Sequence, residues 1–136
     1  MFLVSTYWSF NLHKKMAIAM SAAYFIIFTV MCSMYAGMAF GKMQPCEHKV
    51  LGKPSYNVSA KFEQIFVTGF IVYLVAAIGH VILGLGLWFK KFVLELTGVW
   101  IVMLDAILGQ TALILMTPVF RWNSGGIECA AGVLEN

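Results

Sequence analysis

Three long apolar stretches dominate the hydropathy pattern and predict three membrane-spanning helices. The first, at about 16–41, contains no charged residue between Lys15 and Lys42. The second runs from about 65 to 89 and the third from about 92 to 119. At about 1.5 Å per residue, each is long enough to cross a hydrocarbon core of about 30 Å. Because backbone polar groups in a bilayer must bond within their own segment, each stretch is expected to be a helix.

The connections between these stretches constrain how the helices pair. A polar loop at 42–64 follows the first span, and a tail at 120–136 follows the third. Only Lys90 and Lys91 separate the second span from the third, which predicts a tight antiparallel hairpin. Residues of this hairpin whose numbers sum to about 181 should therefore lie at the same depth. The three spans are expected to form a single membrane domain, 1–136.

Composition supports a lipid environment. The chain is 61% hydrophobic and 11% charged, whereas soluble domains average about 45–50% apolar and about 25% charged residues. A soluble fold of this size could not bury so much apolar surface. The net charge of +3 is small, and no basic run interleaved with aromatic residues indicates nucleic-acid binding. The predicted class is an all-α integral membrane protein whose main partner is the lipid bilayer.

The first fifteen residues do not have the order of a cleaved signal peptide, because Lys14 and Lys15 follow the apolar residues. The aromatic residues Tyr7 and Trp8 before these lysines predict a short interfacial anchor. A frayed tail is the alternative.

The distribution of basic residues leaves the orientation open, with four on one side and five on the other. The four, which lie directly at helix ends, are Lys14, Lys15, Lys90 and Lys91. The other side carries a glycosylation sequon that begins at Asn57. These features favour a cytosolic N-terminus and an exterior C-terminus in a plasma membrane or endomembrane, with a glycan on Asn57.

Three spans place Cys46 and Cys129 on the same side of the membrane. In an oxidising compartment they are expected to form a disulfide; in a reducing one they would be two free thiols. Cys32 lies within the first span and is expected to be a small packing residue. No cysteine pair has the spacing of a zinc site or a CxxC redox site, so the sequence predicts no metal.

Asp105 is the least expected residue of the third span. A carboxylate at the centre of a membrane helix costs on the order of 2.5–3.5 kcal/mol on insertion scales, and such residues face the protein interior and mark function by default. The hairpin register places His80 level with Ile101, four residues or about 6 Å from Asp105 along the axis. The two are expected to form a polar pair. It is either a buried hydrogen bond that fixes helix register or a proton-relay or ligand site. Glu95 is expected to pair with Lys91 at the membrane surface.

His80 also permits a different interpretation, because a mid-membrane histidine is a common axial haem ligand. The segment GHVILGLGLW at 79–88 resembles the histidine-bearing span of succinate dehydrogenase membrane anchors. The resemblance implies an accessory membrane subunit of a respiratory or channel complex, with a haem, quinone or ion site near His80 and Asp105. A partner subunit would have to supply a second haem ligand.

Small residues indicate where helices approach closely, because they let backbones come together in lipid. Gly37 and Gly41 form a GxxxG motif in the first span, and further glycines crowd the second span. The candidates for close helix contact, within the chain or between chains, are Gly37, Gly41, Gly79 and Gly84.

The C-terminal stretch carries a second resemblance. An aromatic–Arg–aromatic triplet is followed by a glycine and by a cysteine–glycine pair. This pattern resembles small MARVEL-like multispan membrane proteins of ciliated protists, although here Cys-x-x-Gly replaces Cys-x-Gly and three spans replace four. It covers about a dozen residues, carried by Phe120, Arg121, Trp122, Gly126, Cys129 and Gly132. The resemblance implies membrane organisation without catalysis.

No nucleophile–base pair, phosphate-binding glycine loop or metal cluster is visible in the loops. The sequence therefore predicts a non-enzymatic structural protein without a cofactor. It would act as a membrane scaffold that self-associates, or packs with partners in a larger assembly, to organise or shape a bilayer. The respiratory or channel subunit is the alternative.

Overall fold

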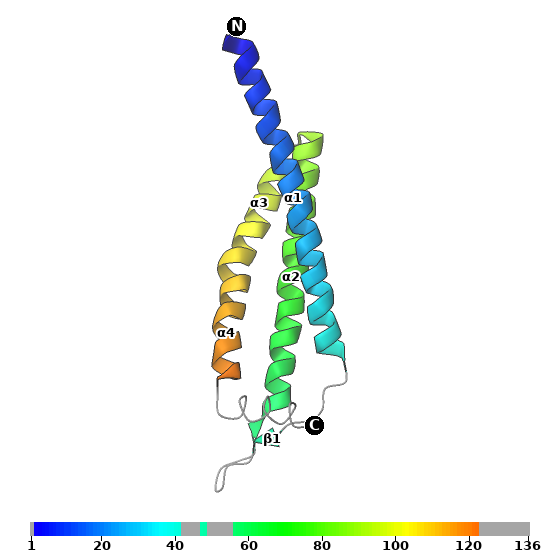
Figure 1. Ribbon diagram of the computed structural model, residues 1–136, viewed down its shortest axis with the longest axis vertical. Helices are drawn as coiled ribbons and strands as arrows, with labels where there is room; N and C mark the ends of the chain where they lie inside the picture. The colour runs from blue at the N-terminus through cyan, green and yellow to red at the C-terminus, as the bar shows by residue number, and fades with distance from the viewer. Residues whose placement is uncertain (1, 42–46, 49–55, 123–136) are drawn as a thin grey trace.

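The structure is a computed structural model that describes residues 2–41, 47–48 and 56–122. Helix α1 spans Phe2–Phe40, and helix α2 spans Val58–Phe89. The third long helix is divided into α3 (Phe92–Leu104), a π-helical segment η1 (Asp105–Gln110) and α4 (Thr111–Arg121). Figure 1 shows the three long helices running side by side. The predicted all-α membrane fold is confirmed.

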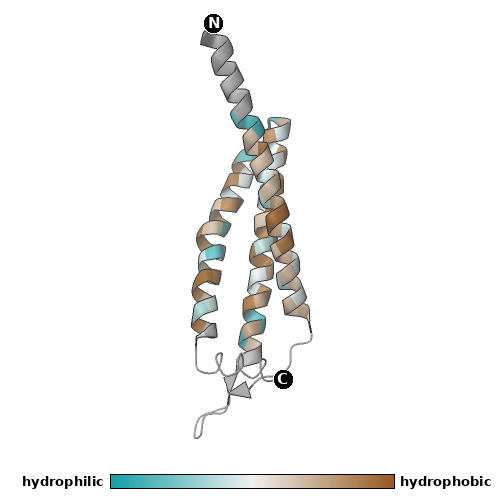
Figure 2. Cartoon of the chain, viewed as in Figure 1, coloured by the Kyte–Doolittle hydropathy of each residue, from teal (hydrophilic) through white to brown (hydrophobic). Residues whose placement is uncertain are grey.

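Each long helix contains a stretch that can cross a membrane. These stretches are 28 to 30 residues long, and Figure 2 shows that apolar residues predominate along them. They are His13–Phe40, Ala60–Phe89 and Phe92–Val119. The N-terminal segment expected at the interface is continuous with α1. The expected loop at 42–64 is shorter than predicted, because α2 already begins at Val58. Within it, the two-residue strands β1 (Glu47–His48) and β2 (Tyr56–Asn57) pair antiparallel.

Helix α2 is the central element, with α1 packed on one side and α3 on another (Figure 1). The turn from α2 to α3 uses Lys90 in the left-handed backbone region, with φ 57°. The Lys91 N–H donates to the Gly86 carbonyl oxygen at 3.0 Å, which is the long hydrogen bond of a Schellman helix end. This local geometry reverses the chain within two residues and produces the predicted tight hairpin.

The hairpin is closely packed because glycines lie where the two helices meet. A Cβ atom on Gly86 would lie 2.5 Å from the Glu95 nitrogen, and one on Gly98 would lie 2.5 Å from the Leu83 nitrogen. In both contacts the residue numbers sum to 181, as they do for Gly79 against Val102. The depth register predicted from the Lys90–Lys91 turn is therefore confirmed.

The bundle is tightest at this hairpin end and opens toward the other end. Beyond η1, α4 lies farther from α2 than α3 does (Figure 1). A groove of about 620 Å³ lies there against α2, with Met116 of α4 on its wall. Its α2 wall includes the polar residues Glu63, Gln64 and Thr68. The third span therefore packs closely along α3 and loosely along α4.

Candidate functional site

His80 lies in the middle of α2 and is only 9% exposed. Tyr24 and Phe28 project from the same face of α1, because residues four apart lie one above the other on a helix. Both rings stack on the imidazole with centroid distances of 5.3 Å. The Ser21 hydroxyl donates to the His80 carbonyl oxygen at 2.7 Å. These contacts hold α1 against α2 at mid-membrane.

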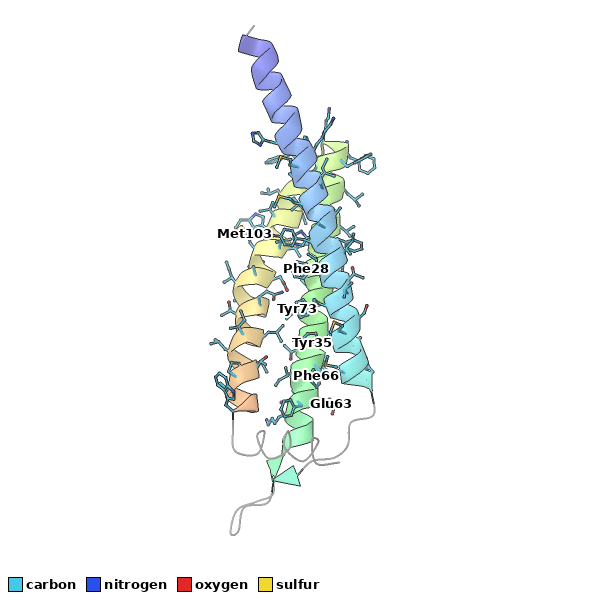
Figure 3. All side chains as sticks on the ribbon, viewed as in Figure 1. Phe28, Tyr35, Glu63, Phe66, Tyr73 and Met103 are labelled. Atoms are coloured by element: carbon cyan, nitrogen blue, oxygen red, sulfur yellow. The ribbon has the colours of Figure 1, made fainter. Side chains whose placement is uncertain are left out.

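The imidazole begins a column of rings that continues along α1 and α2 toward the loop end (Figure 3). Phe28 contacts Tyr73 at 6.0 Å, Tyr73 contacts Tyr35 at 5.1 Å, and Tyr35 contacts Phe66 at 6.2 Å between ring centroids. The Tyr35 ring can pack against α2 because residue 69 is a glycine; a Cβ atom at Gly69 would overlap that ring. Offset and tilted aromatic pairs of this kind contribute about 0.5–1.5 kcal/mol each beyond the area they bury.

Asp105 is the first residue of η1 and is 8% exposed. Its Oδ2 atom accepts a hydrogen bond from the Gln110 Nε2 at 3.2 Å. Its Oδ1 atom occupies space that Gly109 leaves free, because a Cβ on Gly109 would lie 2.8 Å from that oxygen and 3.0 Å from Val72 Cγ1. The carboxyl group is thus enclosed between its own helix and α2.

The hydrogen bond that Asp105 accepts comes from a residue other than His80, its predicted partner. His80 and Asp105 are both buried and lie within electrostatic range of each other. However, the hydrogen bond to Asp105 comes from Gln110 in the same span, and among the described residues the buried His80 Nδ1 has no hydrogen-bond partner. The physical reason is the π-helix, which bonds residue i to residue i+5. Gln110 therefore lies about one turn from Asp105, on a similar side of the helix.

The glycine predictions divide into two groups. Gly79 packs against Ile101 and Val102 of α3, and a Cβ on Gly84 would lie 3.4 Å from the Ser21 hydroxyl oxygen of α1. A Cβ on Gly37, in contrast, would have no atom within 4 Å, and one on Gly41 would meet only Gly37 of its own segment. The sequence did not single out Gly69, Gly98 and Gly109, which are closely packed.

The remaining sequence predictions have mixed outcomes. Cys32 is buried, as expected for a packing residue. Cys46 and residues 123–136, which include Cys129, lie outside the described residues, as does the side chain of Asn57. The expected Glu95–Lys91 pair is replaced by a contact of 3.9 Å between Glu95 and Lys14, because α1 crosses near the start of α3 (Figure 1).

Among the described residues, no three side chains of histidine, cysteine, aspartate or glutamate gather as a metal site would require. Comparison with protein-family models, curated proteins and solved structures gives no match to this chain.

Proposed function

We propose that the protein is a non-enzymatic membrane scaffold that associates laterally, either with copies of itself or within a larger membrane assembly. The observation that carries this proposal is the small share of each outer helix that the chain itself covers. In an 18-residue apolar stretch of each span, 28% of the residues are buried in α2, but only 11% in the first span and 6% in the third. Most of the surface of the first and third spans is therefore exposed to lipid or to neighbouring chains.

Helix α1 offers a surface suited to such a neighbour. Thr29, Ser33 and Gly37 follow one another at a spacing of four and are all exposed. The hydroxyls of Thr29 and Ser33 donate to carbonyl oxygens of their own helix at 2.7 and 2.9 Å, so this surface is smooth and has its hydroxyl donors satisfied. Because lipid provides no hydrophobic drive between helices, close packing of small residues is what supports their association. The MARVEL-like resemblance of the C-terminal segment points to the same kind of role.

The test is the oligomeric state in mild detergent, measured by light scattering after size-exclusion chromatography. The wild-type chain should elute as a defined oligomer. Gly37→Leu should reduce it to a monomer, because the new side chain separates the helices. Met38→Leu changes an exposed neighbour of similar size and should leave the oligomer intact. A wild-type chain from its native membrane that is monomeric and carries no partner protein, both in detergent and in lipid nanodiscs, would contradict the scaffold.

The second candidate function is an intramembrane site at His80 and Asp105, as in an accessory subunit of a respiratory or channel complex. Two observations favour it: the π-helical segment that begins at Asp105, and the buried His80 Nδ1 without a described partner. Single π turns inside helices frequently occur at functional sites. Haem would give a Soret band in protein purified from its native membrane, and this band should disappear in His80→Ala. A quinone or an ion would instead be found in lipid and metal extracts of the same sample.

A further inference from the structure

The face of α1 and α2 that lies away from α3 carries a long apolar groove. Its upper part has a volume of about 350 Å³ and reaches from Phe25 and Val81 to Trp88. Its lower part, of about 330 Å³, shares Phe25 and Val81 and reaches Cys32 and Leu74. The two parts therefore adjoin at these two residues. Only residues of α1 and α2 line the groove, so no part of this chain's third span covers it.

The length and cross-section of the groove indicate what kind of molecule can occupy it. From Leu74 to Trp88 it extends about 21 Å along α2, compared with about 15 Å for one leaflet of the hydrocarbon core. Spread over the seven helical steps from Val81 to Trp88, or about 10 Å, the upper volume corresponds to a cross-section of about 35 Å². A helix is at least about 10 Å across, so it could lie over this groove but not enter it. A single alkyl chain fits it.

The groove wall is suited to such a chain. The small residues Ala22 and Gly84 create the space, and Phe25, Leu85 and Trp88 supply apolar sides. Two polar side chains line this part: the Ser21 hydroxyl donates to the His80 carbonyl oxygen, and the His80 Nδ1 is buried away from the groove surface. A polar ligand would find little to bind here.

The charge at the upper end of the groove indicates which lipid it takes. Trp88 is 68% exposed there, at the level where tryptophan side chains meet the headgroups. Lys15, Lys90 and Lys91 are exposed at the same end. The one acidic residue of residues 1–15 and 90–95 is Glu95, which faces Lys14. This end of the bundle is therefore strongly positive and complements an anionic headgroup.

We propose that the groove between α1 and α2 binds one acyl chain of an anionic phospholipid, whose phosphate is held by the lysines at the hairpin end. The groove shares only His80 with the ring column and only Thr29 with the small-residue surface of α1, and Thr29 lies in its lower part, away from the lysines.

The experiment uses the fluorescence of Trp88 in a full-length chain in which Trp8, Trp100 and Trp122 are replaced by phenylalanine. The protein is reconstituted at high dilution in phosphatidylcholine vesicles that contain brominated phosphatidylglycerol or brominated phosphatidylcholine. The anionic lipid should quench Trp88 with a several-fold preference, about fivefold for each lysine–phosphate contact. Equal quenching by the two lipids would overturn the proposal.

Two matched variants separate the groove from general attraction to the surface. Ala22→Phe fills the groove from an exposed wall position and should abolish the preference, whereas Ala23→Phe adds the same ring at the adjacent exposed position and should retain it. Circular dichroism checks that both variants fold. A chain in which Trp100 is the only tryptophan reports from the third span and should show no preference. An equal preference at Trp100, or an unchanged one in Ala22→Phe, would contradict a specific site.

Discussion

Gly98→Ala tests the close approach of α2 and α3. A Cβ atom at this position would lie 2.5 Å from the Leu83 nitrogen and 2.6 Å from its Cα. These are backbone atoms and cannot rotate away. Because ordinary contacts begin near 3.4 Å, the two helices would have to separate by about 1 Å at this level. Overpacking of this kind costs about 1–3 kcal/mol, while replacing glycine by alanine in a helix returns up to about 1 kcal/mol. A net loss of about 1–2 kcal/mol is expected.

The loss is measured as the free energy of unfolding in mixed micelles titrated with a denaturing detergent and followed by circular dichroism. Gly37→Ala is the matched control, because the same methyl group would meet no atom within 4 Å. It should stabilise the helix slightly or leave it unchanged. Measurements at several protein concentrations separate unfolding from dissociation. If Gly98→Ala proved as stable as Gly37→Ala, the tight hairpin would be refuted.

The remaining predictions concern the polar residue of the third span, the loop that follows the first span and the C-terminal tail. Asp105→Asn should unfold within about 1 kcal/mol of wild type in the same assay, since an amide oxygen still accepts from Gln110. Asp105→Leu should lose about 1–3 kcal/mol because Gln110 is left unpaired, and equal stability of the two variants would contradict this role. Non-reducing peptide mass spectrometry should find Cys46 joined to Cys129, a bond whose removal costs about 2–4 kcal/mol, and two alkylated thiols in native protein would exclude it. A glycosidase should increase the gel mobility of protein from a eukaryotic host, and Asn57→Gln should remove that shift; a mobility that the enzyme does not change would place the loop in the cytosol.

The hairpin and its register could be predicted because they depend on local quantities. Charges at Lys90 and Lys91 interrupt the apolar pattern at one place, and a two-residue turn leaves a single antiparallel register. The same register places Gly98 level with Leu83 and Gly86 level with Glu95. The close contacts at these two glycines could therefore have been found by applying the rule to every glycine of the hairpin.

The surroundings of Asp105 could not be predicted in the same way. In a regular α-helix, residues five apart point in different directions, so Gln110 is not an expected partner. The π-helical segment changes that direction, and Gly109 within it packs against Val72 of α2. This is a tertiary effect without a local sequence signal. Likewise, the sequence shows the aromatic residues of α1 and α2, but only the structure shows that the His80 ring stacks with Tyr24 and Phe28.

The most direct test of lateral association is energy transfer between donor-labelled and acceptor-labelled chains in one vesicle population, measured as lipid is added to dilute the protein. Reversible association through membrane helices predicts a transfer efficiency well above the value for random mixing, falling along a saturable curve on dilution. Gly37→Leu should lie on the random-mixing curve at every lipid-to-protein ratio. A wild-type chain that also follows random mixing throughout would contradict a scaffold built by self-association.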